Sequence, residues 1–429
     1  MTALTGPFIV NSGGSDSTAS GLGPSTAVSF SAMIDSSSSP TQVTASSGVS
    51  GLSAGDVLFA NTSNGRKFNV IASISSQFGT TTITCDYSWA DNFMGTVYCG
   101  GKRATLGGLA DVFDTTNGFD CEVSLETDVT MNATATCGSS REVKIYSDTS
   151  KTRRKITTNQ QYPFSGGNWT FTDLTFHSSY SSSDGRLFRS EFSTGYASVI
   201  AENCIFGDVN NTNNFNQLVN AVSSVTALNT PMPFYARGCL FVNFNRAVGA
   251  AYRPHFIDCH FADMPYINQG MYGGVNADLL VEGMFSNCFF ENVSRIDSAT
   301  DGRYLAFSGC IFDGLAGTNP DPVGAASFNF DNGKECPLFS NNLLTNCGFI
   351  SDEVQGRGNI LYNTTTGMAA FTQSETLASD PYTNRSGGDF TLTSSMQNRF
   401  KFELPDITAK SYSSLHSDSG SGSVIVIED

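Results

Sequence analysis

The sequence has few charged residues and lacks the segments that target or anchor a chain. Charged residues make up 14% of its 429 residues, and no Lys or Arg precedes Arg66. The first 23 residues hold neither a basic start nor a long apolar stretch, so we predict no secretory signal peptide. No stretch approaches the roughly 18 apolar residues that a membrane-spanning helix needs. We therefore expect no membrane insertion.

Basic residues are outnumbered, and the motifs of the common cofactor and metal sites are missing. The net charge is −16, with 39 acidic against 23 basic residues. An acidic surface repels phosphate backbones, so we predict no nucleic-acid binding. There is no Cys-x-x-Cys pair, no glycine-rich phosphate loop and no Gly-x-Ser-x-Gly elbow. We therefore predict no metal and no cofactor.

Aromatic and turn-forming residues are abundant. The chain has 33 Phe and 42 Gly, and Ser, Thr and Asn crowd the spaces between short apolar runs. This composition is typical of an all-β fold with many turns. There are 11 cysteines, an odd number, and without a signal peptide we expect them to be reduced. A disulfide between Cys85 and Cys99 is the less favoured alternative.

A short phrase, Asn/Gly/Asp-Cys-x-Phe, recurs along the second half of the chain. Its cysteines are Cys204, Cys239, Cys259, Cys288, Cys310 and Cys347, and Asp173-Leu174-Thr175-Phe176 is a variant with Leu in place of Cys. Cys and Phe lie two residues apart, so both face the same side of a strand. The preceding residue is always a type that tolerates the left-handed backbone region. Each copy therefore reads as a strand, a one-residue bend and a second strand.

Copies spaced 20 to 37 residues apart predict stacked coils with like residues above like residues. The predicted fold is all-β, a right-handed parallel β-helix with a small N-terminal β-unit and a C-terminal cap. A β-sandwich is the rival interpretation, but it would show hairpins every 8 to 12 residues. The predicted inward ladder consists of Leu174, Cys204, Cys239, Cys259, Cys288, Cys310, Cys347, Phe176, Phe206, Phe241, Phe261, Phe290, Phe312 and Phe349. We interpret its thiols as small core hydrophobes, not as metal ligands.

Composition divides the chain into four predicted parts. Residues 1–54 form a Ser/Thr/Gly-rich arm, 55–104 a small β-unit, 105–390 the parallel β-helix, and 391–429 a C-terminal cap and tail. The tail segment Val424–Ile427 is apolar and follows a Ser/Gly-rich linker. It either pairs with a neighbouring subunit or frays as a terminus.

Carboxylates on the coils are the candidates for catalysis, and we name Asp208, Asp263 and Asp313. Asp208 and Asp263 lie four residues after a ladder cysteine, as do Asn243 and Asn292. Side chains two coils apart are separated by about 10 Å, slightly beyond the range of an inverting glycosidase. The favoured interpretation is that these Asp and Asn residues cap turns.

The repeated phrase resembles the right-handed β-helix of the pectin-lyase-like superfamily over roughly residues 170–350. That superfamily includes pectate lyases, polygalacturonases and phage tailspikes, and the lyase and polygalacturonase catalytic motifs do not match here. The leading part resembles β-helix proteins of tailed phages in three segments, 10–16, 65–68 and 101–106. This resemblance implies a virion component that assembles in the host bacterial cytoplasm as a homotrimer beside other virion proteins.

Two functional hypotheses follow. The first is a tailspike, fibre or head-decoration protein that binds a host or particle surface, such as a host surface polysaccharide, without catalysis. The second is a polysaccharide depolymerase, a glycoside hydrolase or lyase, that acts through Asp208, Asp263 or Asp313.

Overall fold

A computed structural model describes most of the chain up to residue 397. The described residues are 2–46, 49–113, 118–148, 153–180, 186–190, 198–207, 217–221, 234–243, 254–263, 283–293, 296–298, 305–315, 328–330, 338–348, 355–364, 371–372, 374–385 and 389–397. The chain divides into two compact units, residues 1–174 and 175–429. Within the described ranges, no helix is long and apolar enough to cross a bilayer.

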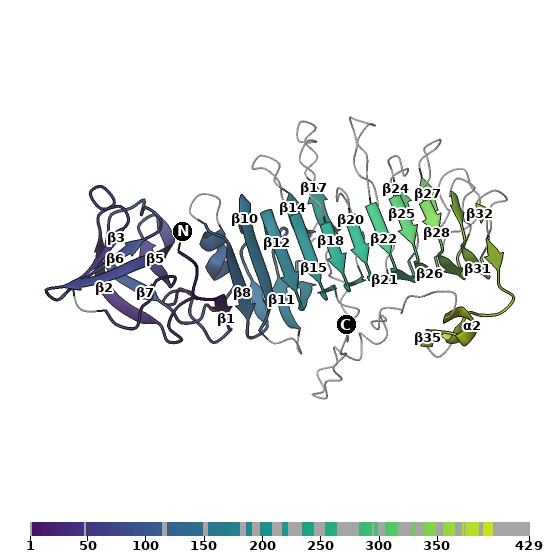
Figure 1. The fold of residues 1–429 in the computed structure, drawn as a ribbon, viewed down its shortest axis with the longest axis horizontal. Helices are drawn as coiled ribbons and strands as arrows, with labels where there is room; N and C mark the ends of the chain where they lie inside the picture. Colours follow the sequence, from purple (N-terminus) through teal and green to yellow (C-terminus); the bar gives the residue numbers. More distant parts are fainter. Residues whose placement is uncertain are drawn as a thin grey trace. The chain divides into compact units, whose positions relative to one another are not determined.

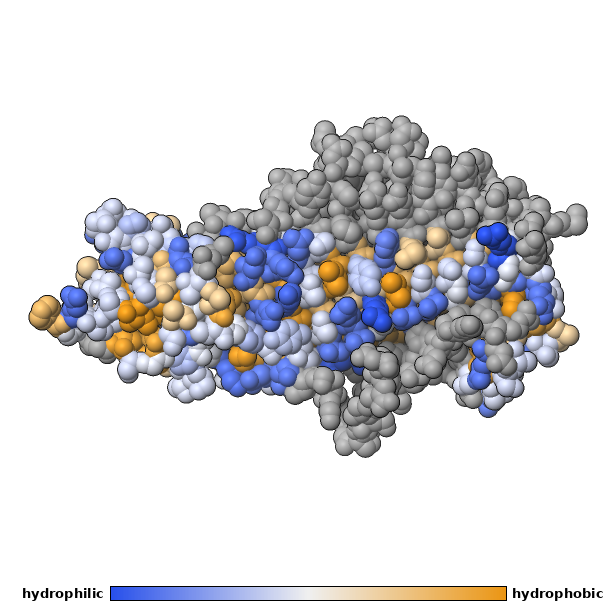
Figure 2. Space-filling model, viewed as in Figure 1, coloured by the Kyte–Doolittle hydropathy of each residue, from blue (hydrophilic) through white to orange (hydrophobic). Residues whose placement is uncertain are grey.

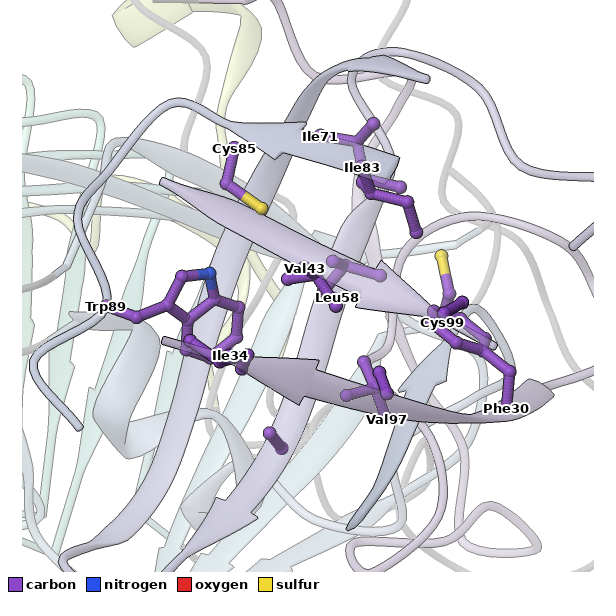
Figure 3. Close-up of a cluster of buried hydrophobic side chains, with 13 residues drawn as sticks. Phe30, Ile34, Val43, Leu58, Ile71, Ile83, Cys85, Trp89, Val97 and Cys99 are labelled. Atoms are coloured by element: carbon purple, nitrogen blue, oxygen red, sulfur yellow. The ribbon is translucent and has the colours of Figure 1, made fainter. Parts of the chain in front are cut away.

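The first unit contains a closed antiparallel barrel (Figure 1). Its strands are β2 (Val28–Ile34), β3 (Gln42–Ala45), β4 (Val57–Thr62), β5 (Gly65–Gln77), β6 (Thr80–Cys85) and β7 (Phe93–Cys99). Alternate side chains of these strands point inward and form an apolar core (Figure 3). Cys85 and Cys99 both lie in this core, and both thiols are free, so the alternative of a disulfide between them is not realised.

The amino-terminal segment differs from the predicted arm. Residues 28–34 and 42–45 supply two strands of the barrel, and β1 (Phe8–Val10) pairs in parallel with β8 (Cys121–Leu125). Phe8 and Val10 are fully buried. Three short stretches with buried apolar residues are enough to bring this Ser/Thr-rich segment into the fold, because each forms one strand of a larger sheet.

The rest of the first unit consists of parallel strands. β10 (Ala135–Ser147) lies between β8 and β12 (Phe164–Thr172), and β9 (Val129–Met131) pairs with β11 (Arg154–Thr158). A short 3-10 turn, η1 (Gly107–Leu109), leads into α1 (Ala110–Phe113). Phe113 packs edge-on against Trp169 of β12, with ring centroids 5.6 Å apart.

The second unit is a stack of coils built from two parallel sheets (Figure 1). We call the first the long-strand sheet: β15 (Ser198–Glu202), β18 (Phe234–Arg237), β20 (Pro254–Ile257), β22 (Gly283–Ser286), β25 (Leu305–Ser308), β28 (Leu338–Ser340), β30 (Gln355–Arg357) and β32 (Phe371–Thr372). The second, the short-strand sheet, holds β13 (Leu174–Ser178), β16 (Ile205–Phe206), β19 (Leu240–Val242), β21 (His260–Ala262), β23 (Phe289–Glu291), β26 (Ile311–Asp313), β29 (Leu343–Thr345), β31 (Ile360–Tyr362) and β33 (Glu375–Thr376). Two parallel side pairs accompany them, β14 (Arg186–Ser190) with β17 (Gln217–Ala221) and β24 (Ile296–Ser298) with β27 (Phe328–Phe330). The all-β parallel β-helix is therefore confirmed.

Each coil turns from the long-strand to the short-strand sheet at one residue with positive φ. The predicted bend residues Asp173, Asn203, Asp258 and Asn287 have φ between 52° and 55°, and Gly238 and Gly309 have φ of 60° and 65°. Asn, Asp and Gly are the residues that adopt this region at least cost. The phrase therefore recurs because every corner needs one of them.

Two rows of phenyl rings fill the interior of the stack. Phe176, Phe206, Phe241, Phe261, Phe290 and Phe312 stack with centroids 4.7–5.0 Å apart. Phe256, Phe285, Phe307 and Phe339 form the second row, 4.7–5.1 Å apart. The rows meet edge to face, as between Phe256 and Phe261 at 5.1 Å and 74°. These separations match the spacing of hydrogen-bonded strands, so the rows rise one ring per coil.

The last predicted copy of the phrase is out of register. Leu343 and Leu344 pair with Ile311 and Phe312, so Asn342, not Cys347, occupies the position of the ladder thiols. Cys347 lies five residues later, next to the second bend at Asn346 (φ 50°), and is buried. Phe349 lies outside the described residues.

A C-terminal hairpin covers part of the outer face of the short-strand sheet. It comprises β34 (Tyr382–Asn384) and β35 (Asp389–Leu392), followed by α2 (Ser394–Gln397) (Figure 1). Tyr382, Leu392 and Met396 bury an outward row of the stack, formed by Phe289, Ile311, Leu343 and Ile360. This hairpin, which we call the cap hairpin, thus lies on the side of the coils.

Candidate functional site

The predicted ladder of carboxylates and amides occupies a second corner of the coils. Asn243, Asp263 and Asn292 have φ of 60°, 52° and 54°, so each serves as a bend residue. The Asn292 amide donates to Oδ1 of Asp263 at 2.7 Å, and both side chains are exposed. Asp208 lies outside the described residues. This geometry agrees with turn formation and gives Asp263 no acidic partner on the neighbouring coil.

Asp313 is the candidate acid that the structure places in a polar cluster. Glu291, Asp313, Thr345 and Tyr362 lie on successive strands of the short-strand sheet, in register. Glu291 and Asp313 are therefore one strand spacing apart, about 4.8 Å. Each of the two residues is only 8% exposed.

The cap hairpin supplies the positive charge to this cluster. Arg385 Nη2 lies 3.0 Å from Oδ1 of Asp313, and its Nε lies 3.6 Å from Oδ2 of Asp380. The guanidinium also lies over the ring of Tyr382, 4.7 Å from its centroid. The Thr345 hydroxyl donates to the same Asp313 oxygen at 2.8 Å. Asp313 thus accepts a hydrogen bond from Thr345 of the stack and forms an ion pair with Arg385 of the cap hairpin.

His260 and Glu291 form a second buried contact beside the Arg385–Asp313 ion pair. His260 Nε2 is 3.1 Å from Oε2 of Glu291, and the His260 side chain has no exposed surface. Its ring stacks on Phe289 at 4.7 Å. His260 lies in the outward row of the short-strand sheet, between Leu240 and Phe289, and is buried there.

Burial dominates the electrostatics of Asp313. It raises the pKa of this carboxyl above its ordinary value, and Glu291 raises it further, while Thr345 and Arg385 lower it. A retaining glycosidase uses two neighbouring carboxyl groups, one of which has a raised pKa, and it holds them about 5 Å apart. Here, however, Arg385 and His260 hold these carboxyls, and the cap hairpin packs on the same strands. The cluster therefore fastens the cap hairpin to the stack.

The ladder thiols point inward and carry no site chemistry. Cys204, Cys239, Cys259, Cys288 and Cys310 are at most 1% exposed. Burial raises the pKa of the Cys347 thiol to about 12 and the pKa values of Cys239 and Cys288 well above their usual range. Among the described residues, no group of three or more His, Cys, Asp or Glu could hold a metal ion. The ladder thiols are buried and pack as small hydrophobes.

Each ladder thiol also satisfies a carbonyl at the corner. Cys288 Sγ donates to the Phe256 carbonyl at 3.4 Å, and Cys310 Sγ to the Phe285 carbonyl at 3.4 Å. Asn342 repeats this contact one coil later, because its amide donates to the Phe307 carbonyl at 3.1 Å. Cys and Asn both donate at this position, whereas Leu174 fills it in the first coil with a buried apolar side chain.

A buried arginine in the first unit was missed from the sequence. Arg103 is fully buried and lies over the rings of Phe59 and Phe68, 4.8 and 5.3 Å from their centroids. Its Nη1 donates to the Ala19 carbonyl at 2.5 Å, and its Nε lies 3.4 Å from Oδ1 of Asp16. In the sequence, nothing in segments 10–16, 65–68 and 101–106 indicates that they meet around the Arg103 side chain.

Asp16 holds the backbone that follows Arg103 in place through hydrogen bonds. Its Oδ1 accepts the backbone N–H groups of Ala104 and Thr105 at 2.9 and 3.2 Å, and its Oδ2 accepts the Thr105 hydroxyl at 2.6 Å. The segments 10–16, 65–68 and 101–106, which carried the resemblance to phage β-helix proteins, therefore meet at one point. We call this arrangement the Arg103 joint.

Comparison with known proteins gives distant structural similarity only. No family model matches the chain, and no curated protein matches it. Among solved structures, it is similar to the tailspike protein gp49 of Acinetobacter baumannii bacteriophage Fri1, a capsular polysaccharide depolymerase, with 12% identity and a TM-score of 0.37 over 67% of this chain. The match spans 61% of the length of that tailspike.

The chain is also similar to the catalytic domain of a GH87 α-1,3-glucanase, with 8% identity and a TM-score of 0.37 over 82% of this chain and 78% of that one. The Agl-KA catalytic domain matches with 11% identity and a TM-score of 0.25, over 84% of this chain and 88% of that one. The assignment of the architecture rests on the strand pairing and the bends described above. The chain is an all-β protein that combines an antiparallel barrel with a parallel β-helix.

Proposed function

We propose that this chain is a structural protein of a tailed-phage virion, of tailspike, fibre or head-decoration type, which forms a homotrimer and binds a surface polysaccharide without cutting it. The observation that carries the proposal is the Arg103 joint. The three segments that resemble phage β-helix proteins are separate in the sequence, yet Asp16 and Phe68 of two of them both lie against the buried Arg103 of the third. Three matching segments that contact one another in the fold are stronger evidence for the resemblance than three matching segments that do not.

The placement of the candidate acids supports binding without catalysis. Asp263 is a bend residue, and Asp313 is held by Arg385 and Thr345. A general acid or nucleophile must reach its substrate within hydrogen-bond distance, and the cap hairpin packs beside Asp313. The intervals between copies of the repeated phrase vary from 20 to 37 residues, and connections of variable length are a common place for ligand contacts.

Location in the particle is the direct test of this function. Antibodies against the purified protein should label intact particles of the phage that encodes it, at the tail or on the head. Light scattering on the eluted protein should give the mass of three chains of 45.7 kDa each. Particles that carry no label would contradict the virion role, and a stable monomer would contradict the trimer.

The second candidate function is a polysaccharide depolymerase, favoured by the neighbouring carboxyls Glu291 and Asp313. Incubation with host capsule or lipopolysaccharide should then release reducing ends or unsaturated sugars. Asp313→Asn and Glu291→Gln should abolish this release if the pair is catalytic, and Asp208→Asn tests the remaining candidate. Asp263→Asn is the matched control, because it replaces a carboxylate at an exposed bend with a residue that favours the same bend.

If wild-type protein binds the polysaccharide and releases no product, the non-catalytic proposal is supported. If it releases product, that proposal fails, and the variants of Asp313, Glu291 and Asp208, compared with the Asp263→Asn control, identify the acid responsible.

A further inference from the structure

The tip of the β5–β6 hairpin holds an aromatic side chain that the fold does not use. Gln77 pairs with Thr80, so Phe78 and Gly79 form a two-residue turn, with φ of 51° and 81°. Turns with two positive φ values usually carry Asn-Gly. A bulky residue in this backbone region is strained by about 1 kcal/mol or more. The Phe78 side chain is also fully exposed, at 104%.

The barrel exposes a second apolar feature on strands β2 and β7. Met33 of β2 and Met94 of β7 are direct cross-strand neighbours, 47% and 82% exposed. Together with Phe78 they are the most exposed large apolar side chains among the described residues. Figure 2 shows apolar surface gathered over the barrel strands that Figure 1 draws in purple. Exposed methionines form adaptable surfaces, and their sulfurs pack favourably against aromatic rings.

The charges around the hairpin tip and the Met33–Met94 pair indicate what can bind to these exposed apolar side chains. No charged residue lies between Lys67 and Asp86, so the hairpin arms are neutral. The chain as a whole carries a net charge of −16, and two copies repel each other through most of their surfaces. Asp35 lies two residues beyond Met33, so the methionine pair has an acidic flank. A neutral tip can approach it without repulsion, whereas an anionic membrane offers nothing to a hairpin without Lys or Arg.

We propose that the barrels of neighbouring copies associate, with Phe78 of one copy packed on the Met33–Met94 pair of the next. The two contacting surfaces differ, so each copy gives its tip to one neighbour and receives a tip from another. Contacts of this head-to-tail kind close into a ring where the rotation between neighbours closes, which after three copies gives a trimer. The inference rests on the homotrimer of the proposed function and is independent of the polysaccharide and virion roles.

Sedimentation velocity of the full chain over a concentration series tests the contact. Phe78→Asn removes the ring and keeps the turn, because Asn is favoured in the left-handed region; its melting temperature should equal or exceed that of the wild type. It should weaken association at least about tenfold, as expected for an aromatic anchor. Met94→Gln should weaken association about threefold. The double variant should match Phe78→Asn alone, because both side chains serve one contact.

Met284→Gln is the matched control. This methionine is 36% exposed on β22 of the second unit, and its replacement should leave association unchanged. A wild-type trimer that Phe78→Asn leaves intact overturns this inference alone. A wild-type monomer at all concentrations overturns both the inference and the proposed trimer. Equal weakening by Phe78→Asn and Met284→Gln also overturns the inference, because the contact would then be non-specific.

Discussion

Replacement of Phe261 by alanine measures how tightly the interior of the stack is packed. Phe261 is fully buried and contacts four other rings. Phe241 and Phe290 stack on it at 4.9 Å, and Phe256 and Phe285 meet it edge-on at 5.1 and 6.0 Å. No ring above or below can move into the space without leaving its own strand, so the cavity would remain.

Phenylalanine-to-alanine changes in cores cost about 3–5 kcal/mol, and the cost grows with the cavity left behind. Four aromatic neighbours place Phe261 at the upper end, so we expect a loss of about 4–5 kcal/mol in the free energy of unfolding. Denaturant unfolding of wild type and variant gives this loss from the shift in midpoint, provided the slope is unchanged.

Phe78→Ala is the matched control, because it removes the same atoms from an exposed position and should change stability by no more than about 0.5 kcal/mol at concentrations where the chain does not associate. A loss below about 1.5 kcal/mol for Phe261→Ala, the level of a tolerated core swap, would refute the packed row.

Three further predictions concern the titration of Asp313, the reactivity of the buried cysteines and the stability of the Arg103 joint. Because the pKa of Asp313 is raised, the folded protein holds a proton there that the unfolded chain, with a pKa of about 3.9, has lost. This contribution favours the fold at acidic pH and declines as the pH rises through the raised pKa; Asp313→Asn should remove that decline, and an unchanged pH dependence of the unfolding free energy would count against it. The ten described cysteines are all free and buried, so a thiol reagent should react with at most Cys336 before denaturant is added. Rapid reaction of several thiols would contradict the inward ladder. Asp16→Ala should destabilise the chain by about 3–5 kcal/mol, because it leaves the buried Arg103 without its carboxylate, and a thermal melt like that of the wild type would show that the Arg103 joint is dispensable.

Local chemistry explains why most of the coils were predictable from sequence. Each corner needs a residue that accepts positive φ, and each strand after it needs inward side chains two residues apart, as in Asn287-Cys288-Phe289-Phe290. These requirements are short-range, so they leave a mark in the sequence. The same requirement misled the prediction at Asn346-Cys347, since the second corner of a coil also takes Asn and a buried thiol can follow it.

Asn342 escaped detection because it is polar. It replaces a thiol by donating to the Phe307 carbonyl, while its Oδ1 accepts the Cys310 N–H at 2.8 Å. A search for apolar ladders cannot recognise a buried amide whose partners lie on neighbouring coils. The cap hairpin was equally hidden, because Arg385 and Asp313 are 72 residues apart and nothing local marks them as partners.

In a parallel β-helix, residues far apart in sequence lie close together on successive coils, and dipolar EPR measures this proximity directly. Ile200 and Met284 are 38% and 36% exposed and lie in one outward row of the long-strand sheet, with Tyr235 and His255 between them. The backbones at these two positions are three strand spacings apart, about 14 Å, although the positions are 84 residues apart in the sequence. Spin labels attached there should therefore interact strongly. Strong dipolar broadening is the predicted result, and a separation of about 30 Å or more, over six strand spacings, would contradict the stack.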